Sequence, residues 1–429
     1  MKEFIRNIIV FFITLEAKLI LKKNKPKVIV VTGSVGKTST KDATYTAVRG
    51  HTFVRKSEKS YNSDIGVPLT VLGVPNGWAN ILQWLRNLID GMLLLVVITP
   101  YPRWLIVEVG ADRPGDISQS LAWLTPDVVI GTRFPDIPVH VEFYSSPEQV
   151  IKEEMFPFSQ LSEGGIAVVS ADDAQTRHLS LKGGVQKISY GISNDADVRA
   201  SNIRILSRGG NPRGISFDVS YREEKARVTL EGVLGSAHRD ATLAGIAGAT
   251  AAGSSLQKAV EAFSEHTPPP GRLRIIQGLK KTTIIDDTYN SSPKATEVAL
   301  EALSEAPGTR KIAVLGDMLE LGSFSVSEHE RIGVQVAKNA DILLTVGVRA
   351  KGIAEGAMKA GMPESAVSVF ERGADSASKL LSMLTAGDVI LVKGSQSIRM
   401  ERIVKSLMAE PEKAKDLLPR QDAEWLTRG

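Results

Sequence analysis

Short apolar runs set off by turn residues begin early in the chain. Residues 28–31 form a β-branched run typical of a strand buried on both faces. The glycine-containing turn 33–38 and a helical stretch over 41–48 follow it, and the runs at 104–110 and 127–130 predict two further strands. A strand, a glycine turn and a helix in this order make a phosphate-binding loop credible.

The second half of the chain repeats the alternation of strands and helices. Short strands separated by turns are expected over 165–234, for example at 184–188 and 214–220, and the Ala- and Gly-rich stretch 241–252 predicts a close-packed helix. Three prolines and a glycine at 268–271 predict a linker, because proline neither continues a helix nor donates to a sheet. Beyond the linker we expect a second doubly wound parallel sheet, with strands at 283–286, 311–315, 341–346, 366–370 and 388–392.

The pattern therefore predicts an α/β protein with three parts. These are an N-terminal amphipathic basic helix over 1–25, a central nucleotide-binding domain over 26–267 and a C-terminal Rossmann-like domain over 268–429.

The N-terminal helix is expected over residues 3–23. Its apolar run 8–13 is shorter than the ~20 residues that a membrane-spanning helix needs. Such a helix either packs on the body of the protein or lies on an anionic membrane surface. A helix from Trp78 leads into a second apolar run at 92–98, which is most simply a buried element, although beside the basic N-terminus it would also help to seat the protein on a membrane.

The amino-acid composition excludes several kinds of site and partner. The 429 residues include no cysteine, which excludes disulfides, thiolate metal sites and a cysteine nucleophile, and which fits a reducing cytoplasm. The net charge of +4 is too small to suggest a nucleic-acid partner. Residues 1–30 carry seven basic and two acidic side chains. We therefore expect a cytoplasmic protein in which 1–25 either packs on the body or makes peripheral contact with the inner face of the membrane.

The loop after the first strand has the groups that bind phosphates and magnesium: backbone N–H groups at a helix start, an ammonium and hydroxyls. The predicted nucleotide-binding residues are Gly33, Ser34, Gly36, Lys37, Thr38 and Ser39. The first glycine of the usual pattern is replaced by Val31.

Two further side chains are candidates for function. Glu108 lies in an apolar strand, where a carboxylate is costly unless paired or metal-bound, so it is either a magnesium ligand or a strand-end acid that faces water. His140 follows the third strand, and a lone histidine is more often structural.

Taken together, these motifs resemble those of the Mur ligase family. The similar segments run in the family's order between about residues 27 and 408, at 32–39, 62–70, 108–111, 140–143, 270–273, 285–293, 315–322 and 392–395. The resemblance implies a P-loop central ATPase domain followed by a Rossmann-like ligase domain. The last four segments are similar to those of the branch that adds D-alanyl-D-alanine to the UDP-muramoyl tripeptide.

The resemblance also implies roles, with ATP and Mg²⁺ as cofactors. Lys37 would hold the terminal phosphates, Thr38 and Glu108 one magnesium ion, and His140 a second. Arg272 would reach the γ-phosphate from the C-terminal domain. Asp287 and Asn290 would contact the nucleotide. The expected substrate residues, which are otherwise structural turn residues, are Asn62, Asp317, Lys393 and Ser395.

Three departures from the family pattern stand out. Glu154 occupies the position of a lysine that many relatives carbamylate, so we expect its carboxylate to replace the carbamate as a catalytic metal ligand; alternatively Lys152 takes this role, or 152–154 is a solvated helix face. Arg239 and Thr242 stand where relatives have asparagines that help to hold the nucleotide. Only 31 residues precede Thr32, too few for the family's UDP-binding domain, so UDP is expected to be bound elsewhere, by a partner, or not at all.

The expected function is an ATP-dependent amide-forming ligase that acts through an acyl phosphate on small peptide and muramoyl-type substrates. A neighbouring alternative is a ligase for a lipid-linked muramoyl, folate or poly-γ-glutamate acceptor. A different class is a nucleotide-binding regulatory or scaffold protein that has lost ligation.

Overall fold

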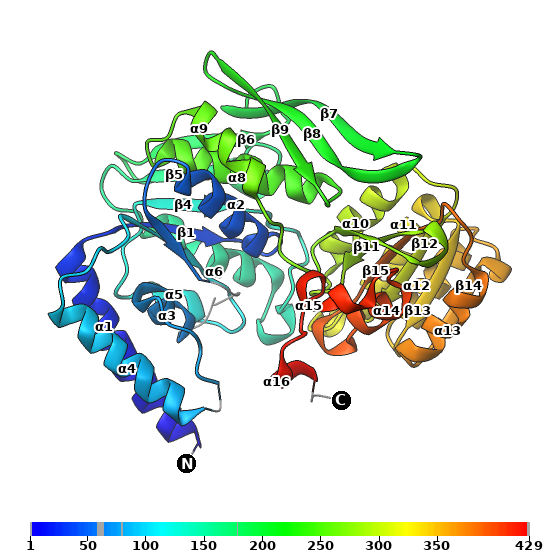
Figure 1. The fold of residues 1–429 in the computed structure, drawn as a ribbon, viewed down its shortest axis with the longest axis horizontal. Coiled ribbons are helices and arrows are strands. Elements are labelled where there is room, and N and C mark those ends of the chain that lie inside the picture. Colours follow the sequence, from blue (N-terminus) through cyan, green and yellow to red (C-terminus); the bar gives the residue numbers. More distant parts are fainter. Residues whose placement is uncertain (1, 58–63, 79, 178, 427–429) are drawn as a thin grey trace.

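The computed structural model describes residues 2–57, 64–78, 80–177 and 179–426. Figure 1 shows two α/β units side by side, with a pair of helices that reaches away from the first of them. Each unit is built on a sheet in which parallel strands prevail, so the predicted fold class is confirmed.

The first sheet belongs to the central unit and has nine strands in the order β2-β3-β1-β4-β5-β6-β7-β8-β9. The strands from β2 to β7 pair in parallel, and β7, β8 and β9 form an antiparallel meander. Their bounds are Lys27–Thr32 (β1), Val54–Lys56 (β2), Trp104–Glu108 (β3), Val128–Gly131 (β4), Ile166–Ser170 (β5), Gln186–Gly191 (β6), Val198–Arg208 (β7), Asn211–Tyr221 (β8) and Glu224–Glu231 (β9).

The second sheet belongs to the C-terminal unit and has six strands in the order β10-β11-β15-β12-β13-β14. The five parallel strands lie where the alternation predicts them, and the added edge strand β10 pairs antiparallel with β11. Their bounds are Arg274–Gln277 (β10), Thr283–Asp287 (β11), Lys311–Gly316 (β12), Ile342–Val346 (β13), Val367–Phe370 (β14) and Val389–Lys393 (β15).

Helices cover both sheets. Their bounds are Lys2–Asn24 (α1), Lys37–Arg49 (α2), Gly66–Leu72 (α3), Ile81–Val96 (α4), Asp116–Leu121 (α5), Pro147–Ser159 (α6), Ala174–Arg177 (α7), Ser236–Ala251 (α8), Leu256–Glu261 (α9), Pro293–Glu305 (α10), Ser325–Asn339 (α11), Lys351–Lys359 (α12), Gly373–Met383 (α13), Glu401–Leu407 (α14), Ala414–Leu417 (α15) and Ala423–Leu426 (α16).

The buried strand β1 fixes the position of the loop that follows it. Its five residues from Val28 to Thr32 are buried, and β1 lies between β3 and β4. Val31 pairs with Glu108 at the end of β3, so the parallel register brings that carboxylate to the edge of the sheet where the loop begins. One hydrophobic cluster extends from Ile29 in β1 to Leu391 in β15 and joins the two units.

The paired helices form what we call the arm, namely α1 together with residues 80–98 around α4. The interpretation of 92–98 as a buried element is wrong: Met92 is 53% exposed and Ile98 is 96% exposed. The reason is that α1 covers one face of α4, where Trp84 is buried, while nothing in the described structure covers the opposite face. No helix in the described part of the chain is long and apolar enough to cross a bilayer.

Candidate active site

The loop between β1 and α2 is shaped for an anion. Gly33 and Gly36 have φ values of 120° and 90°, which favour glycine, and a Cβ on Gly33 would lie 2.3 Å from Thr132 Oγ1. Gly36 is the N-cap of α2 and provides no side-chain cap, so the first turn of the helix presents its backbone N–H groups to a ligand. The six predicted nucleotide-binding residues all lie in this loop or the first turn of α2.

Thr38 and Glu108 meet beside the loop. Thr38 Oγ1 donates to Glu108 Oε1 at 3.0 Å, and Glu108 is 2% exposed. Glu108 Oε2 is buried without a hydrogen-bond partner in the described structure and lies 3.7 Å from Lys41 Nζ. A hydroxyl and an under-satisfied carboxylate next to a phosphate loop fit magnesium, which prefers oxygen ligands. Because Glu108 is buried, the alternative of a strand-end acid that faces water is wrong.

Glu154 reaches the same loop from α6. Ser34 Oγ donates to Glu154 Oε2, and Lys37 Nζ lies 3.9 Å from Glu154 Oε1. Burial raises the pKa of Glu154, an effect that Lys37, Ser34 and His140 oppose. Lys152 is exposed whereas Glu154 is 2% exposed, so the helix turns the glutamate, not the lysine, toward the loop.

His140 lies where the two units touch. Its Nδ1 is 2.7 Å from Glu320 Oε2 of the C-terminal unit, and its Nε2 is 3.3 Å from Asp112 Oδ1. The close contact with His140 lowers the pKa of Glu320. The N–H of Glu142 also donates to the Glu320 carbonyl, so this contact holds the units together at the backbone as well. His140 itself has a φ of 68°, in the left-handed region, and immediately precedes a 3₁₀ turn at Val141–Phe143.

Arg272 reaches the phosphate loop from the C-terminal unit. Its carbonyl accepts a hydrogen bond from His238 Nε2 at 2.5 Å, which anchors the segment to α8. Its guanidinium carbon lies 4.1 Å from the centre of the Tyr289 ring, and its Nε is buried without a hydrogen-bond partner in the described structure. The side chain lines one cavity with Gly36 and Ser39 of the phosphate loop.

Asp287 and Lys393 line that cavity too. They are neighbours across β11 and β15, and Lys393 Nζ donates to Asp287 Oδ2 at 2.6 Å and to the Asn290 carbonyl at 2.9 Å. Burial lowers the pKa of Lys393, and the Asp287 carboxylate opposes this change. The Asn290 side chain accepts from the Ser291 N–H, so it caps its own turn.

The other predicted substrate residues that the structure describes, unlike Lys393, do not line the cavity. Asp317 Oδ1 accepts from the Ala350 N–H at 2.7 Å, and the Asp317 carbonyl accepts from the Ser395 N–H at 2.9 Å. These two residues hold together the loops at the ends of β12, β13 and β15, and they are not among the residues that line the cavity. Asn62 lies outside the described residues.

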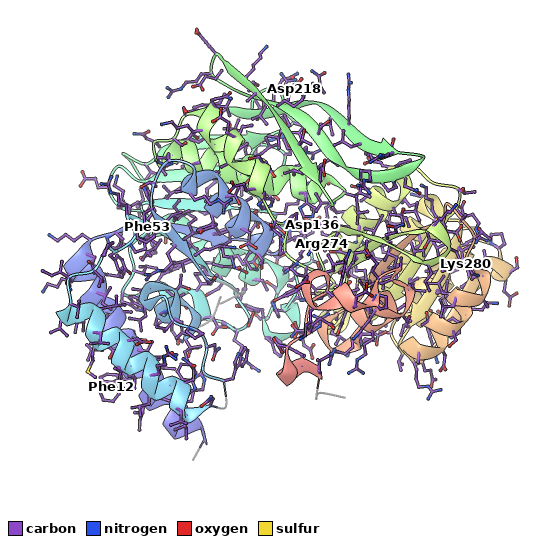
Figure 2. The ribbon with its side chains drawn as sticks, in the orientation of Figure 1. Phe12, Phe53, Asp136, Asp218, Arg274 and Lys280 are labelled. Carbon is purple, nitrogen blue, oxygen red and sulfur yellow. The ribbon has the colours of Figure 1, made fainter. Side chains whose placement is uncertain are left out.

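The cavity has a volume of about 70 Å³, and a larger one of about 540 Å³ lies beside it, with Arg133 in the lining of both. Figure 2 labels Asp136, which lines the larger cavity, in the middle of the molecule where the units meet. Arg133 forms an ion pair with Asp240, which lines the smaller cavity, and Arg239 pairs with the same aspartate at 2.8 Å. Sequence reasoning missed Arg133 and Asp240; the signal was that Arg133 follows β4 at the edge of the sheet that carries the phosphate loop.

Two family models match the chain. The Mur ligase middle domain matches residues 90–240, and the Mur ligase, glutamate ligase domain matches residues 271–396.

Named relatives cover most of the chain. It is 30% identical over 391 residues to a UDP-N-acetylmuramoyl-tripeptide–D-alanyl-D-alanine ligase of Escherichia coli, a match that covers 89% of this chain and 76% of that protein. The similarly named ligase of Bacillus subtilis is 26% identical over 405 residues and is matched over 79% of its length and 92% of this chain. The structure of MurF ligase from Thermotoga maritima in complex with ADP is similar in fold, with a TM-score of 0.75 at 24% identity, over 94% of this chain and 84% of that one.

Proposed function

Because the chain belongs to the Mur ligase family, we propose that it is an ATP- and magnesium-dependent ligase that joins D-alanyl-D-alanine to the free carboxylate of a UDP-muramoyl tripeptide. The relatives named for this reaction span about nine-tenths of the chain, which supports the substrate assignment.

One observation carries this proposal. The phosphate loop of the central unit and three charged side chains of the C-terminal unit, namely Arg272, Asp287 and Lys393, line a single cavity. A module that only binds a nucleotide has no need of an arginine from a second unit, whereas phosphoryl transfer does, since negative charge builds up on the transferring group.

The first step would make a leaving group. The substrate carboxylate attacks the terminal phosphoryl group of ATP to give an acyl phosphate and ADP. Lys37 and Arg272 would stabilise the charge on the phosphoryl oxygens from opposite sides, and the backbone N–H groups at the start of α2 would hold the phosphates that stay behind.

Magnesium would be held by Thr38 and Glu108 on one side of the loop and by Glu154 on the other. His140 would add its Nε2 only by giving up the contact with Asp112, while its Nδ1 keeps the contact with Glu320. When bound, it supplies positive charge to the phosphate oxygens. Glu154 would provide the carboxylate that relatives obtain from a carbamylated lysine, so no modification is required at this position.

The second step would form the amide. The amino group of the dipeptide attacks the acyl carbon, and phosphate leaves. An acyl phosphate is hydrolysed by water, so the contact between His140 and Glu320, which joins the units beside the loop, would serve to keep the site closed until the amine has reacted.

The test is release of ADP by the purified chain. We expect release only when ATP, UDP-muramoyl tripeptide and D-alanyl-D-alanine are all present, with one amide formed for each ADP. Omission of the dipeptide and the Lys37→Ala variant are the controls. Binding of ATP without ADP release in the complete mixture would leave only a nucleotide-binding protein.

A ligase for a lipid-linked muramoyl acceptor is the second candidate, and the exposed apolar face of the arm favours it over folate or poly-γ-glutamate acceptors. We propose a cytoplasmic location with contact to the inner face of the membrane. A lipid-linked acceptor that supports faster ADP release than the UDP-linked one would select this candidate.

A further inference from the structure

Exposed hydrophobic side chains are concentrated on the arm. Of the 25 large hydrophobic side chains that are exposed in the described structure, 14 belong to it, five in α1 and nine between residues 80 and 98. Monomeric proteins seldom expose a contiguous apolar surface of this kind without a partner.

These side chains form a stripe on each helix. In α1 they are Ile8, Phe11, Phe12, Leu15 and Leu19, and in α4 the spacing continues through Leu82, Leu85, Ile89, Met92, Leu93 and Val96. Both series follow the spacing of three or four residues that places side chains on one face of a helix. Figure 2 labels Phe12 on the arm, far from the join of the two units.

The opposite faces already have partners. Ile13, Ala17 and Ile20 of α1 are fully buried in a cluster that includes Trp84 of α4. Lys23 Nζ donates to the carbonyls of Leu94, Leu95 and Val97 at 2.9–3.0 Å, which ties the two helix ends together. The arm is therefore a packed pair of helices with an apolar outer surface, and not a frayed terminus.

The charges around this surface are mainly basic. Lys18, Lys22 and Arg86 are exposed beside the stripes. Among the described acidic side chains of the arm, Glu16 is 9% exposed and turned inward, and Asp90 lies 3.8 Å from Arg86. An apolar face bordered by lysine and arginine complements the acyl chains and the anionic headgroups of a lipid surface.

From this arrangement we propose that the arm is a monotopic membrane-binding element that lies in the headgroup region of an anionic bilayer. Its helices are too short or too charged to span the membrane, so they bind parallel to its surface. Trp78, which is 52% exposed just before α4, has the side chain that most favours the membrane interface. The proposal does not depend on the ligase reaction.

Vesicle flotation with the full chain tests it. We expect the protein to float with phosphatidylcholine vesicles that contain phosphatidylglycerol and to float weakly with phosphatidylcholine alone. The double variant Leu82→Glu/Val96→Glu, at positions 75% and 78% exposed, should lower partitioning at least about tenfold. The matched control Val326→Glu/Val348→Glu, at positions 72% and 71% exposed in the C-terminal unit, should float like the parent.

A second variant distinguishes the contribution of the basic side chains to membrane binding from that of the apolar face. Lys18→Gln/Lys22→Gln should weaken binding to the anionic vesicles by about fivefold for each lysine and leave binding to neutral vesicles unchanged. All variants should keep the thermal transition of the parent, since the altered side chains are exposed.

Three outcomes would overturn the proposal. The parent fails to float with anionic vesicles, the arm and control variants float equally well, or the parent is a dimer in solution that Leu82→Glu/Val96→Glu dissociates without any vesicle binding. The last outcome would make a second copy of the chain the occupant of this surface.

Discussion

Arg272 is the residue on which the proposed chemistry depends most. It lies in the C-terminal unit, yet it lines a cavity with Gly36 and Ser39, because the hydrogen bond between His238 and its carbonyl fixes the segment against α8. The face of the Tyr289 ring holds the guanidinium at 4.1 Å and leaves its Nε without a partner in the described structure. A planar cation held in this way is ready for a phosphate.

Replacing Arg272 by Lys should therefore impair catalysis more than binding. A lysine keeps the charge but loses the planar set of donors, so we expect kcat to fall by roughly 10²–10³. Steady-state ADP release measures this fall, and calorimetry with ADP, which lacks the γ-phosphate, should show an almost unchanged affinity.

The neighbouring arginine provides the control. Arg274 Nη1 donates to the Asp416 carbonyl at 3.2 Å and does not line the cavity, so Arg274→Lys should retain kcat. Equal losses in the two variants would remove the role assigned to Arg272.

The carboxylate of Glu154 leads us to expect that turnover needs no carbon dioxide or bicarbonate. Since its carboxylate already lies beside Ser34 and Lys37, turnover of the parent should not change when bicarbonate is removed. Glu154→Gln should lower kcat at least about a hundredfold. Glu154→Lys, which restores the residue of many relatives, should have low activity that bicarbonate raises. Full activity of Glu154→Gln would show that the carboxylate is dispensable.

Among single residues, the sequence identified most of those that form the phosphate loop. Glycines, a lysine and hydroxyls between a strand and a helix have few other uses. The sequence also placed Lys393 and Asp287 correctly at strand ends. It could not separate these from Asp317 and Ser395, since residues that hold strand-end loops and residues that face a cavity look alike in one sequence. The roles of all of them remain predictions.

Among the elements, α2 and α8 pack unusually closely. A Cβ on Gly245 of α8 would lie 2.7 Å from the Ala43 carbonyl carbon and 2.8 Å from the Thr44 nitrogen in α2. The phosphate loop is attached to α2, so this packing also positions the loop.

Gly245→Ala should destabilise the protein in spite of the better helix propensity of alanine. The clash is with backbone atoms, so we expect the free energy of unfolding to fall by about 1–3 kcal/mol in urea titrations. Gly373→Ala in α13 is the control, because its Cβ would make only ordinary contacts at 3.4 Å with Ile403. A Gly245→Ala protein as stable as the parent would show that the two helices separate easily.

The arm should give the protein a pH-dependent stability. Glu16 is buried between α1 and α4, its Oε2 has no hydrogen-bond partner in the described structure, and burial raises its pKa to about 7. The folded protein thus holds this proton more tightly than the unfolded chain does, and stability is lost as the pH rises from about 4.5 to about 7.

Glu16→Met should remove this loss and raise the stability at pH 8 by about 1–3 kcal/mol, with little effect at pH 4.5. Thermal unfolding of both proteins across this range measures the difference. Glu371→Gln, whose side chain is 76% exposed, should follow the parent at every pH. A constant offset between Glu16→Met and the parent at all pH values would contradict the assignment.

The sequence predicted most strands within a few residues, because apolar runs between turn residues are strong signals for buried strands. It failed for 92–98, where an apolar run is exposed, since hydrophobicity alone does not tell whether another element covers it. It also missed β10, whose four residues are too few to establish a periodicity.

For the whole molecule, the two units are held so that residues of both line one cavity. Contacts such as His140 with Glu320 cross the join, and one hydrophobic cluster includes residues of both sheets. The order of motifs predicted two parallel sheets. It did not predict how the two units face each other, because the contacts between them involve side chains far apart in the sequence. The boundaries at 25 and 267 remain predictions.

The most direct measurement follows oxygen from the substrate carboxylate. UDP-muramoyl tripeptide labelled with ¹⁸O at that carboxylate is turned over with ATP and D-alanyl-D-alanine, and the released phosphate is analysed by mass spectrometry. If the site activates the carboxylate as an acyl phosphate, each turnover transfers one labelled oxygen to phosphate. Phosphate that is released without label would contradict the account.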